Sequence, residues 1–199
     1  MIHIVDDFFE DPFNVRSIAL KQKYAPERYN YPGVRCREVP DSIVQHVLSQ
    51  VRYYTKESAG ELSNPAFHYV TKEFLSGNFH TDAYKYICIV YLSLESPSDS
   101  GTEICDKDQE FREDVNNEKI FKIIKDFHKN PSDLIIRYNY ARVKRKLLSF
   151  YKPIMKIPNK FNRGLIFPAW YFHRAQNFFG TSIEDSRLTL VSFVDSIKS

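Results

Sequence analysis

Hydrophobic residues in the first third of the chain recur at the spacing of α-helices. Residues 11–23 open with Asp11-Pro12, where the aspartate can cap the free amides of a first turn and the proline loses no hydrogen bond. After Pro40, apolar side chains return every three or four positions up to Val51. We therefore predict two helices, over residues 11–23 and from 40 to about 51, which follow a short strand at residues 2–5.

From Pro65 onward the pattern changes to that of β-strands. Residues 86–94 (YICIVYLSL) are apolar and rich in β-branched and aromatic side chains, which is typical of a buried strand. Other segments with strand character are residues 67–74, 80–82, 101–105, 154–157, 163–167, 171–178 and 187–194. Several short strands separated by turns predict a mainly β fold, either a barrel or a double-sheet jelly roll.

Residues 106–150 interrupt this β pattern. Apolar residues recur at helical spacing up to about residue 130, and a second helix is predicted over residues 134–150, with a basic cluster at residues 142–146. Because a segment of about 45 residues is marginal for independent folding, we interpret it as a helical insertion within one domain that spans residues 1–199. The basic cluster could contact an acidic substrate, although such clusters are more often a solvated helix face.

Composition and charge narrow the class of protein. A net charge of +3 on 199 residues is too small to favour a nucleic-acid partner. The three cysteines are odd in number and lack a CxxC spacing, so we expect reduced thiols in a cytoplasmic protein. The first residues are interrupted by acidic side chains, and no window approaches 18 apolar residues. We therefore expect neither a signal peptide nor a membrane span.

Three polar positions in the β region have the residue types of a metal site. His80 and Asp82 lie two apart at a predicted strand end, which places the imidazole and the carboxylate on one face. His173, from a later strand, would add a third ligand on the same side of the metal. Two histidines and one carboxylate form a facial triad that leaves coordination positions open and suits non-heme Fe(II) working with oxygen.

Arg187 adds a cation to this set. Strand alternation over residues 187–194 places Arg187 and Thr189 on one face. An arginine inside a barrel is costly unless it meets an anion, and a guanidinium beside a hydroxyl is a good receptor for a carboxylate. An alternative is that Arg187 pairs with Glu184 or Asp185 at the mouth of the strand.

The other four histidines, His3, His46, His68 and His128, lack the paired spacing of a ligand set. A lone histidine is more often a polar residue with satisfied hydrogen bonds than a metal ligand. We expect His128 on a charged surface.

The order HTD…H…RLT on a strand-rich chain resembles the Fe(II)- and 2-oxoglutarate-dependent oxygenases, in particular their prolyl-hydroxylase-type branch. The segments IVYLSL, GTEI and NRGLIFPAWYFHRAQ are similar to stretches of that branch, and DDFFEDPFNVRSIAL and YPGVR look like a bacterial and phage subgroup. The resemblance covers most of the chain apart from residues 106–150. It implies a double-stranded β-helix (jelly-roll, cupin-like) core with N-terminal helices and a helical insertion.

The resemblance also implies an activity and its site. Fe(II) would be bound by the catalytic residues His80, Asp82 and His173. The co-substrate 2-oxoglutarate would be bound by Arg187, Thr189 and Tyr91. The reaction would use O2, is compatible with ascorbate, and would hydroxylate a C–H bond of a peptidyl or small-molecule substrate while 2-oxoglutarate is decarboxylated to succinate.

Some positions depart from the family pattern. The interval between Asp82 and His173 is longer than usual, which we attribute to the insertion. Phe193 stands where the nucleic-acid demethylase branch has a second arginine, which argues against alkylated-base repair, and Ser100 replaces a glycine. The substrate itself cannot be read from the sequence, although residues 24–37 and 106–150 are the predicted specificity surfaces. Two alternatives remain: a cupin-like metal enzyme that uses no 2-oxoglutarate, and a non-catalytic jelly-roll module.

Overall fold

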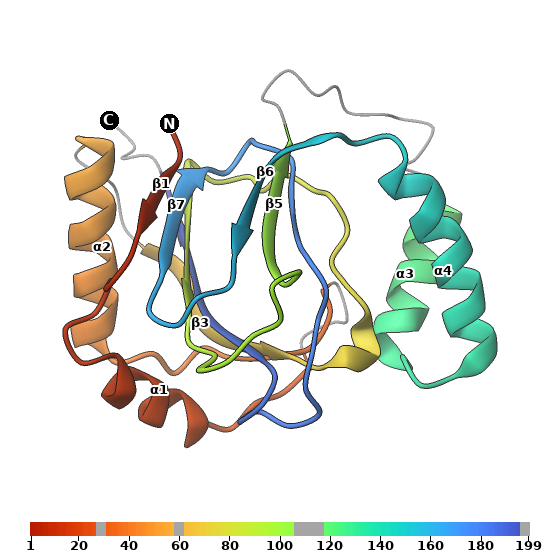
Figure 1. The fold of residues 1–199 in the computed structure, drawn as a ribbon, viewed down its shortest axis with the longest axis horizontal. Coiled ribbons are helices and arrows are strands. Elements are labelled where there is room, and N and C mark those ends of the chain that lie inside the picture. Colours follow the sequence, from red (N-terminus) through yellow and green to blue (C-terminus); the bar gives the residue numbers. More distant parts are fainter. Residues whose placement is uncertain (27–30, 58–61, 106–117, 196–199) are drawn as a thin grey trace.

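The computed structural model describes residues 1–26, 31–57, 62–105 and 118–195. Within these ranges the chain forms two antiparallel sheets and four α-helices (Figure 1). The helices are α1 (Pro12–Leu20), α2 (Asp41–Thr55), α3 (Glu118–Lys129) and α4 (Leu134–Leu148). The strands are β1 (His3–Val5), β2 (Val34–Cys36), β3 (Leu62–Val70), β4 (Tyr86–Tyr91), β5 (Gly101–Cys105), β6 (Pro153–Pro158), β7 (Gly164–Pro168), β8 (His173–Ala175) and β9 (Arg187–Val194).

The larger sheet has six strands in the order β1-β7-β4-β9-β3-β2, and the smaller sheet has the order β6-β5-β8. Apolar residues of both sheets, such as Ile89, Ile104 and Phe167, are buried together in one core between them. The two sheets form a double-stranded β-helix, which confirms the predicted jelly-roll core with its flanking helices.

A second core joins helices α1 and α2 to the other face of the six-stranded sheet. Val15 and Ala19 of α1 and Val47 of α2 are buried against sheet residues that include Cys88 and Leu190. In Figure 1 these two helices lie on the side of the sheet away from α3 and α4. Their amphipathic pattern therefore results from covering one face of the sheet.

Local signals explain why several elements begin where they do. The Asp11 carboxylate accepts a hydrogen bond from the Asn14 amide, and Pro12 occupies the first turn of α1, as the sequence predicts. Gly164 opens β7 where the chain crosses Phe8: a Cβ built there would lie 2.1 Å from the phenylalanine ring. Only a residue without a side chain fits this crossing.

Four predicted strands differ from the observed ones by more than one residue. The strand predicted over residues 86–94 is observed as β4, which ends at Tyr91. β3 ends at Val70 and a 3₁₀ turn, η1, spans Lys72–Phe74. Residues 80–82 are not a strand end, because His80 makes only an isolated bridge with His173. The strand predicted over residues 171–178 is limited to β8. We refer to residues 75–85, between η1 and β4, as the ligand loop.

The insertion predicted at residues 106–150 forms the helical hairpin α3–α4, and its residues 106–117 lie outside the described part of the chain. Phe127 of α3 and Tyr140 of α4 stack at 3.9 Å between ring centroids. The Tyr140 hydroxyl donates a hydrogen bond to Asn78 Oδ1 at 3.2 Å, and Lys144 Nζ donates to the Ser76 carbonyl at 2.5 Å. The hairpin is therefore fastened directly to the ligand loop.

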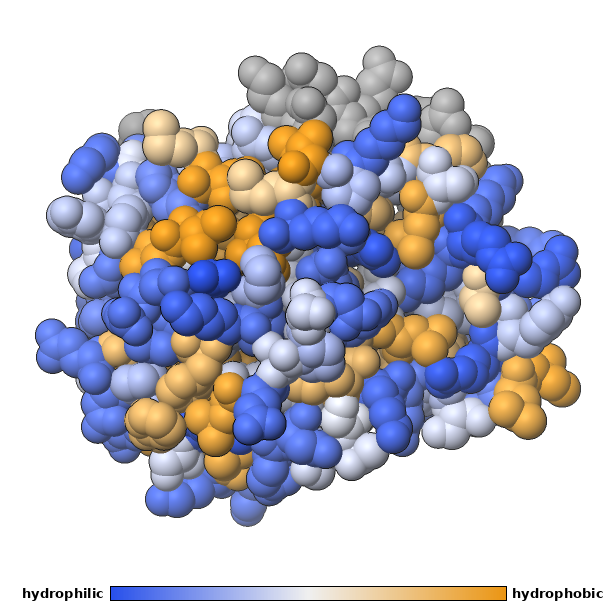
Figure 2. Space-filling model, in the orientation of Figure 1, coloured by the Kyte–Doolittle hydropathy of each residue, from blue (hydrophilic) through white to orange (hydrophobic). Residues whose placement is uncertain are grey.

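The face in Figure 2 is mainly hydrophilic, and its hydrophobic atoms gather in several patches separated by polar side chains. Among the described helices, none combines the length and the apolar character needed to span a membrane.

Candidate metal centre and pocket

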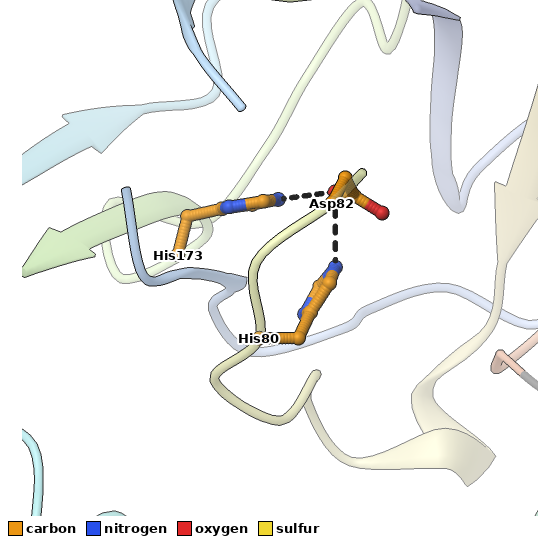
Figure 3. A group of neighbouring side chains, drawn as sticks. All are labelled: His80, Asp82 and His173. Atoms are coloured by element: carbon orange, nitrogen blue, oxygen red, sulfur yellow. Dashed lines mark ion pairs between the residues drawn. The ribbon is translucent and has the colours of Figure 1, made fainter. Parts of the chain in front are cut away.

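Two non-adjacent backbone segments bring the three predicted metal ligands together. His80 and Asp82 come from the ligand loop and His173 is the first residue of β8. The His80 amide donates to the His173 carbonyl at 3.1 Å, and the His173 amide returns a hydrogen bond at 2.9 Å. One potential ligand atom from each side chain lies within 4.8 Å of the other two. Figure 3 shows both imidazole rings directed at the Asp82 carboxylate.

The hydrogen bonds of the imidazole rings fix which nitrogen faces the centre. His80 Nδ1 lies 2.9 Å from the Asn78 carbonyl and His173 Nδ1 lies 2.9 Å from the Tyr171 carbonyl. Because a carbonyl can only accept, each Nδ1 carries the proton, and each Nε2 of a neutral ring has a free lone pair. These Nε2 atoms lie 3.7 Å and 3.3 Å from Asp82 Oδ2. Such carbonyl-oriented histidines are the usual arrangement at a metal.

The charges of this cluster also fit a cation. His80 is 52% exposed toward the open side, yet partial desolvation and the neighbouring His173 lower its pKa, which favours the neutral ring that binds metal. Burial opposes ionisation of Asp82, but the neighbouring histidines and the positive charge of Arg35 outweigh it and lower the pKa of the carboxyl. Two imidazoles and one carboxylate form a donor set suited to Fe(II).

A cavity of about 610 Å³ opens beside the three ligands. Its wall includes all three and also Arg187, the first residue of β9. The four residues that the sequence singles out for the site therefore line the same cavity. Apolar side chains between the sheets, such as Ile87, Ile89 and Val191, form much of the remaining inner wall.

Arg187 has the features of an anion receptor. It is 3% exposed, and its Nε has no hydrogen-bond partner among the described residues. Its guanidinium carbon lies 5.5 Å from the centre of the Tyr91 ring. Burial lowers the pKa of Arg187, and the Tyr91 hydroxyl opposes this change. Among the described residues Arg187 forms no ion pair with Glu184 or Asp185, the alternative partners, and the Asp185 carboxylate accepts hydrogen bonds from the Thr181 and Ser182 amides. A buried guanidinium with an unused N–H is suited to a ligand carboxylate.

Tyr91 and Thr189, the other two residues predicted to bind 2-oxoglutarate, differ in their position relative to the cavity. Tyr91 is fully buried behind Arg187, and its hydroxyl donates to Thr102 Oγ1 at 2.7 Å. The Thr189 hydroxyl donates to the His68 carbonyl at 3.3 Å, and Thr189 does not belong to the described wall of the cavity. Tyr91 therefore contacts the predicted carboxylate receptor, whereas the Thr189 hydroxyl is already used within the sheet.

Several wall residues were not identified from the sequence. His68 lies on the pocket side of β3, where burial and the charges of Arg35 and Arg187 hold its pKa well below the ordinary value. Thr102 lines the cavity from β5. The expectation that His128 lies on a charged surface is wrong: it is 6% exposed and lines the cavity, because α3 turns that face inward. The sequence indicated only that His68 belongs to a strand, and not that its side chain faces a cavity.

Comparison with solved structures identifies the fold class. The chain is similar to HygX from Streptomyces hygroscopicus, solved with nickel and 2-oxoglutarate bound, at a TM-score of 0.62 and 12% identity over 99% of this chain and 83% of that one. It is also similar to a Trichoplax adhaerens prolyl hydroxylase in complex with a hypoxia-inducible-factor peptide fragment, at a TM-score of 0.58 and 10% identity over 99% and 84%.

A Pseudomonas putida prolyl-4-hydroxylase gives a TM-score of 0.54 and 11% identity over 98% of this chain and 92% of that one. The fold is thus the double-stranded β-helix of the Fe(II)- and 2-oxoglutarate-dependent oxygenases, as the sequence resemblance implied. Over residues 1–194 the chain matches DUF6445, a family of unknown function, and it belongs to that family. A comparison with curated protein sequences found no match.

Proposed function

We propose that the protein is an Fe(II)- and 2-oxoglutarate-dependent dioxygenase that hydroxylates a C–H bond of a peptidyl or small-molecule substrate. The observation that carries the proposal is the shared cavity of His80, Asp82, His173 and the buried Arg187. In one cavity this chain combines three side chains that could hold a metal with a cation that has an unused N–H. The fold of solved 2-oxoglutarate-dependent enzymes supports the same conclusion.

Each group has a role in this proposal. His80, Asp82 and His173 would hold the iron, with the two rings kept in the required tautomer by the Asn78 and Tyr171 carbonyls. When bound, iron and 2-oxoglutarate supply the oxidising chemistry, in which O2 is consumed, 2-oxoglutarate becomes succinate and CO2, and the substrate gains a hydroxyl group.

The remaining groups orient the co-substrate and keep the site dry. Arg187 would bind the far carboxylate of 2-oxoglutarate, and Tyr91 would hold the guanidinium in place from behind. Ile87, Ile89 and Val191 would exclude water from the inner part of the cavity, which strengthens the electrostatic attraction between Arg187 and the carboxylate.

A succinate-release assay with Fe(II), 2-oxoglutarate and O2 tests the proposal across a library of peptides and metabolites. We expect slow substrate-independent succinate formation and stimulation by a subset of compounds. Iron bound at one equivalent without any 2-oxoglutarate binding or turnover would instead favour a cupin-like metal enzyme. Absence of stoichiometric iron binding would refute the metal site and favour a non-catalytic module.

A further inference from the structure

The cavity beside the candidate metal ligands is larger than 2-oxoglutarate alone requires. Its volume of about 610 Å³ lies within the range of about 300–1,000 Å³ that holds drug-sized ligands. The co-substrate is a small dicarboxylate, and the proposed function places it between the metal and Arg187. The remainder of the cavity is therefore available to the substrate, whose chemistry should match the wall that it meets there.

The helical hairpin contributes a mainly apolar part of this wall. Its described wall residues are Ile120, Phe121, Ile124 and His128 of α3 and Leu147 of α4. Ile120 and Ile124 lie about one helical turn apart, so their side chains share a face of α3, and both are half-buried. Phe121 is 57% exposed although it also belongs to the wall. Apolar surface of α3 is therefore left open to the cavity and its mouth.

Aromatic side chains continue this apolar surface to the candidate metal ligands. Phe79 precedes His80 in the ligand loop, and its ring centroid lies 5.1 Å from that of Tyr151, which follows α4. Both rings line the cavity, together with Leu147 near the end of α4. A molecule that extends from the metal ligands toward Phe121 therefore meets mainly apolar side chains of the hairpin and of the ligand loop.

We propose that the substrate has an apolar body, an aliphatic chain or an aromatic ring, that packs against Ile120, Phe121, Ile124 and Leu147, which we call the hairpin wall. The inference rests on the proposed function and extends it to a substrate class. The hairpin wall then determines specificity, because binding removes apolar surface of both partners from water. An apolar small molecule and a peptide with a large apolar side chain share this chemistry.

Binding of uncharged probes to the protein loaded with Ni(II) and 2-oxoglutarate tests the inference without turnover. The probes are alkanols and phenylalkanols of increasing length, each compared with the analogue that carries a second hydroxyl at its far end, and titration calorimetry is the readout. Each added methylene should tighten binding about three- to fourfold, as burial of a CH₂ group predicts. The second hydroxyl should weaken binding about tenfold or more, because it would be buried against the hairpin wall without a partner.

A second measurement places the probe in this cavity. Mn(II) broadens the NMR signals of nearby protons, whereas Zn(II) does not. The signals of a bound probe should therefore broaden with Mn(II)-loaded protein that also holds 2-oxoglutarate, and should stay sharp with the Zn(II)-loaded form. A peptide with one leucine, compared with the same peptide with asparagine in that place, distinguishes the two sources of the apolar body.

Variants separate the hairpin wall from other apolar surface of the hairpin. Ile124→Ala should weaken the longest probes about three- to tenfold and the shortest probes least. Ile124→Asp should abolish the gain with chain length, because it places a charge against the apolar chain. Ile135→Ala is the matched control: Ile135 is 74% exposed on α4 and lies outside the described wall of the cavity, so this variant should behave as the wild type.

Three outcomes overturn the inference: an affinity that does not rise with chain length, a rise that both Ile124 variants leave unchanged, or probe signals that stay sharp with Mn(II). Circular dichroism of each variant checks the fold. Failure of the wild-type protein to bind Ni(II) and 2-oxoglutarate would contradict the proposed function itself. Absence of a chain-length effect in protein that binds both would contradict the substrate class alone, so the two failures are distinguishable.

Discussion

Lys144 provides a quantitative test of how the α3–α4 hairpin is held on the ligand loop. The side chain is 7% exposed, and its Nζ lies 2.5 Å from the Ser76 carbonyl and 3.5 Å from the Tyr140 hydroxyl. Burial, with a smaller contribution from the positive charge of Arg174, lowers the pKa of Lys144 from 10.5 to about 7. Much of the folded protein therefore holds a neutral amine here at neutral pH.

The direction of the pH dependence follows from this shift. Between the folded pKa of about 7 and the unfolded value of 10.5, the unfolded chain holds a proton at Lys144 that the folded protein lacks. Stability should therefore rise with pH across this window and fall as the pH drops toward 7. At 1.36 kcal/mol for each pKa unit, the contribution of Lys144 to the free energy of unfolding grows by about 2 kcal/mol between pH 7 and pH 9.

Urea unfolding of the wild type and of Lys144→Met measures this contribution, because methionine keeps the apolar stem without the amine. The unfolding free energy of the wild type minus that of Lys144→Met should increase by about 2 kcal/mol from pH 7 to pH 9. Lys146→Met removes a lysine from an exposed position of the same helix, and its difference from the wild type should stay constant. An equally constant difference for Lys144→Met would refute the reasoning.

Three further predictions concern the site and the core. Asp82→Ala should abolish both stoichiometric iron binding, measured by elemental analysis, and succinate formation; full turnover would disprove the metal assignment. Arg187→Ala should raise the 2-oxoglutarate concentration for half-saturation about tenfold or more while iron remains bound, and an unchanged value would exclude its role. Gly164→Ala should lower the free energy of unfolding by about 1–3 kcal/mol because the new methyl group meets the Phe8 ring, and an unaltered urea midpoint would contradict that crossing.

Elements with strong local signals could be predicted closely from the sequence. The strands over residues 101–105 and 187–194 match β5 and β9, because their hydrophobic patterns are fixed by burial along a single strand. The start of α1 follows from the Asp11-Pro12 cap, which needs no distant contact. The three candidate metal ligands and Arg187 could be singled out from the sequence as well, since costly polar residues stand out in an apolar β region.

The rest depends on contacts between distant segments. The backbone at His80 is set by hydrogen bonds with His173, so local strand character gave the wrong conformation for residues 80–82. Alternation placed Thr189 on the face of Arg187, but its hydroxyl finds a partner in the neighbouring strand. The pairing of β2 with β3 is likewise non-local, so the sequence could name residues 24–37 as a specificity surface but could not place Arg35 in the wall of the cavity.

The hairpin α3–α4 both lines the cavity and forms hydrogen bonds with the ligand loop. Its inner side chains Ile120 and Ile124 form part of the cavity wall, while Tyr140 and Lys144 hold Asn78 and Ser76 of the ligand loop. Substitutions that reshape the wall should therefore shift the loop that carries two of the candidate metal ligands. In directed evolution, substitutions that broaden the substrate range would therefore lower the metal affinity. Screens for altered specificity should then recover compensating second-site substitutions at the contact between the hairpin and the ligand loop.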